Sequence, residues 1–183
     1  GASLSWTRVS RSTISGNSVV DGAAGGVLAR PGKYGGPTRI DQSTITGNNA
    51  AGASSPISGS GGGVASYGYE TAAQIRNSPI AANTSVKPAG GVLAIRLGNQ
   101  EPVDLQSTIV ADNVAGGAPS DTLSQLVVPP APAPVDDPGG VTAGFSLVEA
   151  PGNQLGGAPA GSNITGVDPQ LAPLAANGGP TQT

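Results

Sequence analysis

The chain contains no cysteine, no histidine and no methionine among its 183 residues. Without cysteine it can form neither a disulfide framework nor a thiolate metal site. Without histidine it has no imidazole for a catalytic triad or for a zinc site. We therefore expect no cofactor, and carboxylates are the side chains that remain as candidates for a calcium or catalytic site.

Aromatic side chains are also scarce, at 3% of the chain with one Trp and one Phe. A compact core of ordinary bulk cannot be built from so few large side chains. A narrow coil of stacked Val, Ile, Leu and Ala solves this problem, because each rung buries small side chains against its neighbours. The 30 glycines and 17 prolines approach a disordered composition, but the apolar residues recur at fixed offsets, which favours order.

The net charge is −3, and the eight Lys and Arg residues are dispersed along the sequence. This distribution is not typical of nucleic-acid-binding proteins, so we do not expect nucleic acid as a partner. The sequence has no run of 18 apolar residues, so we expect no membrane span. It begins at Gly1 without a signal peptide, and we interpret it as a piece of a longer, exported protein.

One six-residue motif recurs at intervals of about thirty residues, which indicates a solenoid. The copies occupy residues 12–17 (STISGN), 43–48 (STITGN), 78–83 (SPIAAN) and, one residue longer, 107–113 (STIVADN). A second apolar residue stands five positions before the central one, as Ile40 does before Ile45. Because five is odd, both side chains can face inward only if a corner separates them, so each copy should contain two short strands.

Alignment of the copies on their apolar positions produces two columns. The core column contains Ile14, Ile45, Ile80 and Val110, and the polar column contains Asn17, Asn48, Asn83 and Asn113. We expect the first column to form one inward stack. We expect the second to form an internal ladder in which each side-chain amide bonds the amide one rung away. The serines and threonines of the copies are expected on a hydrated outer face.

A second signature, a glycine pair followed by Val, lies between the copies and predicts a third strand. It occurs at residues 25–29, 61–66 and 90–95. Glycine permits a tight turn there and lets neighbouring coils approach closely. The predicted fold is therefore all-β: a right-handed parallel β-helix of about four rungs, each with three short strands and with projecting loops.

The regular pattern stops after Asn113, which suggests three regions within one domain. We expect β-helix rungs over residues 1–113, a proline-rich loop excursion over 114–143, and a C-terminal rung with a capping segment over 144–183. The excursion contains the adjacent carboxylates Asp136 and Asp137. A solvated loop is our preferred interpretation of this pair, and a calcium or catalytic site is the alternative that stays open.

Several motifs together resemble a known family. They are STISGN, STITGN, STIVADN, the GGGV turn, GFSLV at 144–148 and the ending GVDPQLAPLAANGGPTQT at 166–183. The set resembles bacterial right-handed parallel β-helix proteins of the choice-of-anchor Q type, over most of residues 6–183. The resemblance implies secretion and attachment to the cell surface, and it implies no known reaction. Family members usually continue into a hydrophobic segment and an anchor or sorting region, so the chain resembles a fragment.

We therefore expect an extracellular or cell-surface protein with a structural or adhesive role, and not an enzyme. Glycans bound by the loops and further copies of the chain stacked end to end, as dimers or fibres, are the expected partners. The alternative is a polysaccharide-active lyase or hydrolase, since β-helix proteins include many such enzymes. That chemistry needs clustered carboxylates, which the sequence does not display.

Overall fold

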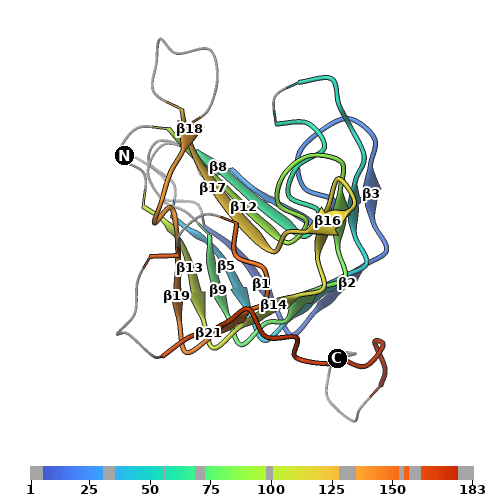
Figure 1. Ribbon diagram of the computed structural model, residues 1–183, viewed down its shortest axis with the longest axis vertical. Helices are drawn as coiled ribbons and strands as arrows, with labels where there is room; N and C mark the ends of the chain where they lie inside the picture. The colour runs from blue at the N-terminus through green and yellow to red at the C-terminus, as the bar shows by residue number, and fades with distance from the viewer. Residues whose placement is uncertain are drawn as a thin grey trace.

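The computed structural model describes residues 6–30, 36–55, 57–68, 73–97, 101–127, 135–152, 155–156 and 162–176. This part of the chain contains no helix, and its backbone winds into a parallel β-solenoid (Figure 1). Strands that are about thirty residues apart in sequence lie side by side and form four sheets. The predicted all-β solenoid is confirmed.

Four rungs each contribute one strand to every sheet. The first comprises β1 (Thr7–Ser10), β2 (Thr13–Ser15), β3 (Ser18–Val19) and β4 (Val27–Ala29). The second comprises β5 (Thr38–Asp41), β6 (Thr44–Thr46), β7 (Asn49–Ala50) and β8 (Val64–Gly68). The third comprises β9 (Gln74–Arg76), β10 (Ile80–Ala81), β11 (Thr84–Ser85) and β12 (Val92–Leu97). The fourth comprises β13 (Val103–Gln106), β14 (Ile109–Ala111), β15 (Val114–Ala115) and β17 (Thr122–Val127).

Five further strands complete the sheets. They are β16 (Ala118–Pro119), β18 (Val135–Asp136), β19 (Val141–Gly144), β20 (Leu147–Val148) and β21 (Ile164–Thr165). Sheet A has the order β1-β5-β9-β13-β19, and sheet B has the order β2-β6-β10-β14-β20-β21. Sheet C has the order β16-β15-β11-β7-β3, and sheet D has the order β18-β17-β12-β8-β4. All pairings are parallel except those of β16 with β15 and of β18 with β17.

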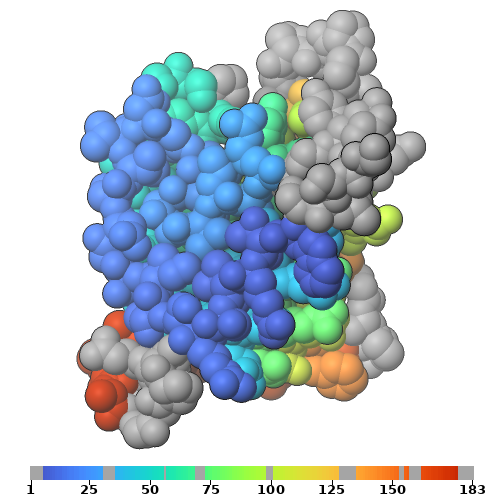
Figure 2. All heavy atoms as spheres, turned by 180° about the vertical axis from the view of Figure 1, so that it is seen from behind, coloured from blue at the N-terminus to red at the C-terminus, as the bar shows by residue number. Residues whose placement is uncertain are grey.

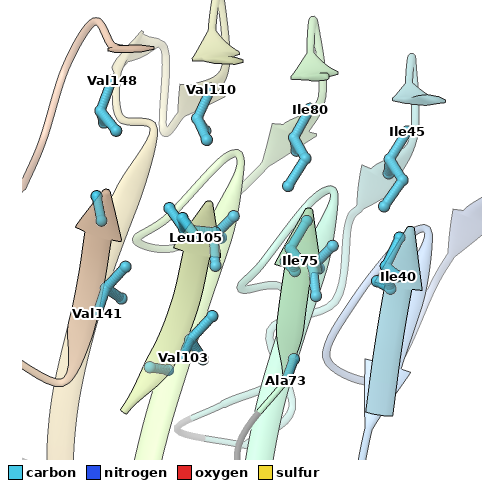
Figure 3. Packing of buried hydrophobic residues seen from close by; sticks show 14 of the residues in the cluster. Ile40, Ile45, Ala73, Ile75, Ile80, Val103, Leu105, Val110, Val141 and Val148 are labelled. Atoms are coloured by element: carbon cyan, nitrogen blue, oxygen red, sulfur yellow. The ribbon is translucent and has the colours of Figure 1, made fainter. Parts of the chain in front are cut away.

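The strand register places the predicted core column in one line through sheet B. Ile14 pairs with Ile45, Ile45 with Ile80, and Ile80 with Val110. Figure 3 shows this row from Ile45 to Val110, with a second row from sheet A facing the same interior. Ile45, Ile80 and Val110 are fully buried, whereas Ile14 in the first rung is half-buried. Sheets A and B thus each contribute a single layer of inward-facing side chains to the core.

The number of strands per rung differs from the expected three. After the asparagine of each copy the chain pairs for two more residues, as in β7, and these short strands form sheet C. Two residues are too few to produce a visible alternation of polar and apolar side chains. For this reason the sequence pattern did not predict sheet C, which forms one of the four sides of the coil.

The regular stack also continues into the range predicted as a loop excursion, residues 114–143. Strand β17 pairs with β12 in parallel over six residue pairs, so the solenoid extends to Val127. The two residues directly before β17 are Ser120 and Asp121, whereas a glycine pair directly precedes β4, β8 and β12, which is why β17 was not predicted. Residues 128–134, the proline-rich centre of that range, lie outside the described residues. Beyond them, β19, β20 and β21 add strands to sheets A and B.

We expect Ile45→Asp to abolish the cooperative fold. The Ile45 side chain has 0% exposure, so the substitution would place an unpaired carboxylate in an apolar interior. The cost is several kcal/mol, a large part of the stability of a typical domain. Circular dichroism and thermal melting would show the loss. Gln42→Asp, at an exposed corner of the same rung, should melt like the parent, and a cooperative transition in Ile45→Asp would contradict the inward stack.

Candidate functional site

The four asparagines of the predicted polar column occupy the corner between sheets B and C. The Oδ1 atom of Asn83 accepts hydrogen bonds from the backbone N–H and from Nδ2 of Asn48, both at 3.0 Å. Asn17 with Asn48 and Asn83 with Asn113 repeat the Nδ2 to Oδ1 bond at 2.9 Å. Asn83 Nδ2 also donates to the carbonyl of Ile45 at 3.1 Å. The structure thus brings the four asparagines together as a continuous amide ladder.

A buried carboxylate ends this ladder. Asp121 Oδ1 accepts hydrogen bonds from the Asn113 backbone N–H at 3.2 Å and from its Nδ2 at 2.8 Å. Asp121 Oδ2 accepts from the Ala150 N–H at 2.7 Å. Burial raises the pKa of Asp121, the charge of Glu149 acts in the same direction, and the three hydrogen bonds oppose the shift. Asp121 therefore joins the fourth rung to the next one.

A second ladder follows the corner between sheets A and B. Ser43 Oγ accepts from the Ser12 N–H at 3.2 Å, and Ser78 Oγ accepts from the Ser43 N–H at 3.1 Å. Further along, Ser146 Oγ accepts from the Thr108 N–H at 3.1 Å. Ser43, Ser78 and Thr108 are buried. The expectation of a hydrated outer face is wrong for this position, because the corner N–H groups are buried and need an acceptor.

The glycine pairs pack against the asparagine ladder. A Cβ atom on Gly62 would lie 2.2 Å from the Thr84 carbonyl oxygen. A Cβ atom on Gly63 would lie 2.8 Å from the Gly91 carbonyl oxygen and 3.0 Å from Asn83 Nδ2. No side chain fits at either position. The glycine pair therefore allows the chain to pass from sheet C to sheet D without displacing the hydrogen-bonded asparagines.

The outer face of sheet A gathers arginines that are dispersed in the sequence. Its outward positions form two columns, which we call the sheet A face. The columns are Arg8, Arg39, Gln74, Asp104 and Thr142, and Ser10, Asp41, Arg76, Gln106 and Gly144. Arg8, Arg39 and Arg76 therefore come from three successive rungs onto one surface. The apparent dispersion of basic residues along the chain conceals this grouping.

Ion pairs across rungs hold part of the sheet A face in place. Arg8 Nε lies 3.1 Å from Asp41 Oδ2, and Arg76 Nη2 lies 3.9 Å from Asp104 Oδ2. Gln106 Nε2 donates to Asp104 Oδ1 at 2.8 Å. The Arg8 and Arg76 side chains remain 64% and 52% exposed. Their guanidinium groups are thus oriented by the acids and still open to a ligand.

Arg39 lies at the centre of this surface. Its Nε donates to Gln74 Oε1 at 3.1 Å, and its Cζ atom lies 5.1 Å from the centroid of the Trp6 ring. The Trp6 side chain is 64% exposed. Two depressions of about 400 and 500 Å³ open on the face, and Arg39 lines both. The guanidinium group of Arg39, the amide of Gln74 and the indole ring of Trp6 therefore lie together beside these two depressions.

The adjacent carboxylates Asp136 and Asp137 have different surroundings. Asp137 Oδ2 lies 3.2 Å from Arg96 Nη1 and accepts a hydrogen bond from Ser124 Oγ at 3.3 Å. Asp136 is exposed and sits in β18, opposite Gln125 of β17. Among the described residues, no group of three or more metal-ligating side chains includes this pair. Asp137 instead connects the end of β18 to Arg96 of β12 and to Ser124 of β17.

Three other carboxylates meet where the sheet B strands β14, β20 and β21 end. Asp112, Glu149 and Asp168 each offer an oxygen atom within 4.8 Å of the others. The Asp112 N–H donates to Glu149 Oε2 at 2.9 Å. Burial raises the pKa of Asp112, and the negative charges of Glu149 and Asp168 raise it further. Carboxylate oxygens are the ligands that hard cations prefer, so these residues could hold one.

Sequence reasoning missed this cluster because the last two copies of the motif were not aligned with the first four. Val110 pairs with Val148, and Val148 pairs with Thr165. With that alignment, Asp112, Glu149 and Asp168 all fall within three residues after the same strand position. The register alone would have predicted that they share a corner.

No family model, curated protein or solved structure matches the chain. No helix in the described part of the chain is long and apolar enough to cross a membrane. The structure by itself therefore defines the class as that of parallel β-solenoid repeat proteins.

The buried acid at the end of the ladder should make stability depend on pH. The pKa of Asp121 is raised in the folded protein above its ordinary value of 3.8, so the folded state binds the proton more tightly than the unfolded state. Its contribution to stability is full below that ordinary value and is lost as the pH rises through the raised pKa. Asp112 contributes in the same direction.

We expect Asp121→Asn to be less stable than the parent by about 1–3 kcal/mol, because its amide NH₂ group would face the Ala150 N–H. We also expect a flatter pH dependence in this variant, since the titrating group is gone. Urea unfolding from about pH 4 to neutral would measure both effects. Asp136→Asn, at an exposed acid, should keep the parent's slope, and an unchanged slope in Asp121→Asn would contradict the assignment.

Proposed function

We propose that this chain is a structural and adhesive protein of the bacterial cell surface, and that its sheet A face binds polysaccharides that carry carboxylate groups. The observation that supports the proposal is the group of guanidinium groups on one face, with Arg8 and Arg76 exposed and Arg39 half-buried against the Trp6 ring. Successive rungs are spaced by about 4.8 Å, so a polymer lying along the solenoid meets one arginine in each of three rungs. Arginine forms paired hydrogen bonds with carboxylates.

The extracellular location and the surface attachment are supported by the motifs that resemble the choice-of-anchor Q proteins, above all the ending at residues 166–183. The non-enzymatic role is supported by the absence of histidine. It is also supported by the acids of the sheet A face, because Asp41 and Asp104 are engaged by Arg8 and Arg76.

We expect Arg39→Ala to weaken binding to polygalacturonate by about tenfold, because a hydrogen bond to a charged group is lost at the centre of the face. A glycan array would first identify acidic ligands, and calorimetry would then measure affinity. Binding to the parent should fall as the salt concentration rises. Arg30→Ala is the matched control, since Arg30 lies over Tyr67 of sheet D.

Equal losses in both variants, or no binding to any acidic glycan, would contradict the binding face. Release of unsaturated or shortened uronides by the purified chain would instead favour the alternative, a polysaccharide-active enzyme. That result would be decisive if Asp112→Asn or Asp41→Asn removed the turnover, because Asp112 belongs to the cluster of three carboxylates and Asp41 lies among the arginines of the sheet A face.

We also propose that copies of this chain associate through their first rungs. Strands β1, β2, β3 and β4 are outer strands of their sheets in the described part of the chain. Figure 2 looks onto this end, where the first rung forms much of the visible surface. Its core residues Val9 and Ile14 are half-buried. Unpaired strand edges over a partly exposed core favour pairing with another chain.

The opposite end of the solenoid is less suited to such pairing. Strands β16 and β18 run antiparallel to the last parallel strands of sheets C and D. An antiparallel edge interrupts the register that a following parallel rung needs. The first rung of one copy therefore meets the first rung of another, which gives a closed dimer and not a filament.

Light scattering over a dilution series should show a monomer that converts to a dimer as concentration rises and grows no further. Val9→Lys should shift the equilibrium toward the monomer, because it places a charge at the edge of the interface. Val135→Lys, at an exposed position in β18, should associate like the parent. A strict monomer at high concentration would contradict the proposal, and so would continued growth beyond the dimer.

A further inference from the structure

The outer face of sheet B carries a groove of about 430 Å³ between its strands and the C-terminal segment that follows β21. Figure 1 shows this segment, in red, running along the outside of the sheet. Pro79, Ala81 and Ile109 line the groove on the sheet side, and residues 171–174 line it on the other. Its volume lies in the range of small-molecule sites, and most of its walls are apolar.

One end of the groove is negatively charged. Asp112 lines it there, with oxygen atoms of Glu149 and Asp168 within 4.8 Å. No salt bridge between described residues involves any of these three carboxylates. A cation bound at this end would relieve the repulsion between them.

The other end holds a hydroxyl group with no partner. Thr44 lines the groove, is 4% exposed, and its Oγ1 has no hydrogen-bond partner within the described chain. A buried hydroxyl without a partner is unfavourable, so a polar atom of an occupant would be stabilised beside it.

We propose that this groove binds an aliphatic chain with an ammonium group at one end and a hydrogen-bonding group at the other. The ammonium group pairs with Asp112, the methylene groups pack on Pro79, Ala81 and Ile109, and the second polar group bonds Thr44. Thr44 is aligned with Ile109, two rungs or roughly 10 Å away at about 4.8 Å per rung, and Asp112 lies three residues after Ile109. An extended chain of about seven carbons covers the two rungs, and the hydrogen bonds at its two ends add the remaining reach. This site is on a different sheet from the proposed polysaccharide face and does not depend on it.

The probe is 7-amino-1-heptanol, and 1,7-heptanediol is its uncharged counterpart. We expect calorimetry or NMR titration to show binding of the amino alcohol, with the diol about tenfold weaker, because an ammonium–carboxylate hydrogen bond is stronger than a neutral one. Asp112→Asn should remove this difference. The Asp112 backbone has φ 56°, a left-handed conformation that asparagine tolerates, so the variant should fold.

Thr44→Val should weaken binding of the amino alcohol about fivefold through loss of one uncharged hydrogen bond, and Thr44→Ser should restore it. Asp136→Asn, at an exposed acid outside the groove, should bind like the parent. Equal affinity for the diol would overturn the proposal, as would unchanged affinity in either Asp112→Asn or Thr44→Val. A response to calcium chloride with none to the amino alcohol would also overturn it.

Discussion

A narrow coil must bend its backbone at every corner, and each bend buries N–H groups that the neighbouring strands do not satisfy. The asparagine ladder solves this problem between sheets B and C, and the serine ladder solves it between sheets A and B. The carboxamide of Asn48 both accepts from one rung and donates to the next. The glycine pairs depend on the asparagine ladder, because a Cβ atom on Gly26, Gly63 or Gly91 would lie 2.9–3.1 Å from an asparagine Nδ2 atom.

The ladders occupy inward and corner positions, so the residue type at outward positions is free to vary. The strand register then decides which of these outward side chains become neighbours on the surface. Residues 30 to 38 positions apart in sequence become neighbours on sheet A, as Arg8 and Arg39 do. Charges that are scattered along the chain can therefore form one surface, while sheet B carries an apolar outer face only one corner away. The two candidate sites lie on these two faces, and neither disturbs the interior column of isoleucines.

The parts of the fold that repeat with a strict chemical requirement could be predicted. The five-residue spacing of Ile40 and Ile45 indicated a corner, and matching core positions instead of letters placed Val110 and Asn113 in register with Ile45 and Asn48. The two-residue strands of sheet C could not be predicted, because they carry no alternation. Strand β17 was missed because Ser120 and Asp121 directly precede it in place of a glycine pair, and Asp121 was missed because it lies outside the copies of the motif.

The sites were harder to predict for a physical reason. An outward side chain is not constrained by the rung above it, so a column of ligands leaves no repeated letter in the sequence. Arg39, Gln74 and Asp104 occupy equivalent positions with different chemistry. The acidic corner shows the same effect, since Asp112, Glu149 and Asp168 stand at slightly different distances from their strands. Such sites can be found only after every rung has been aligned.

The direction of the asparagine ladder explains why it ends in an acid. Every amide donates one of its Nδ2 hydrogens to the following rung, so the last asparagine, Asn113, needs an acceptor there. The group at position 121 must also accept from the Ala150 N–H. An asparagine there has one acceptor oxygen and would place its own NH₂ group against that N–H, whereas a carboxylate accepts on both oxygens. Aligned amides polarise one another and favour a negative charge at their donor end, which offsets part of the unfavourable burial of Asp121.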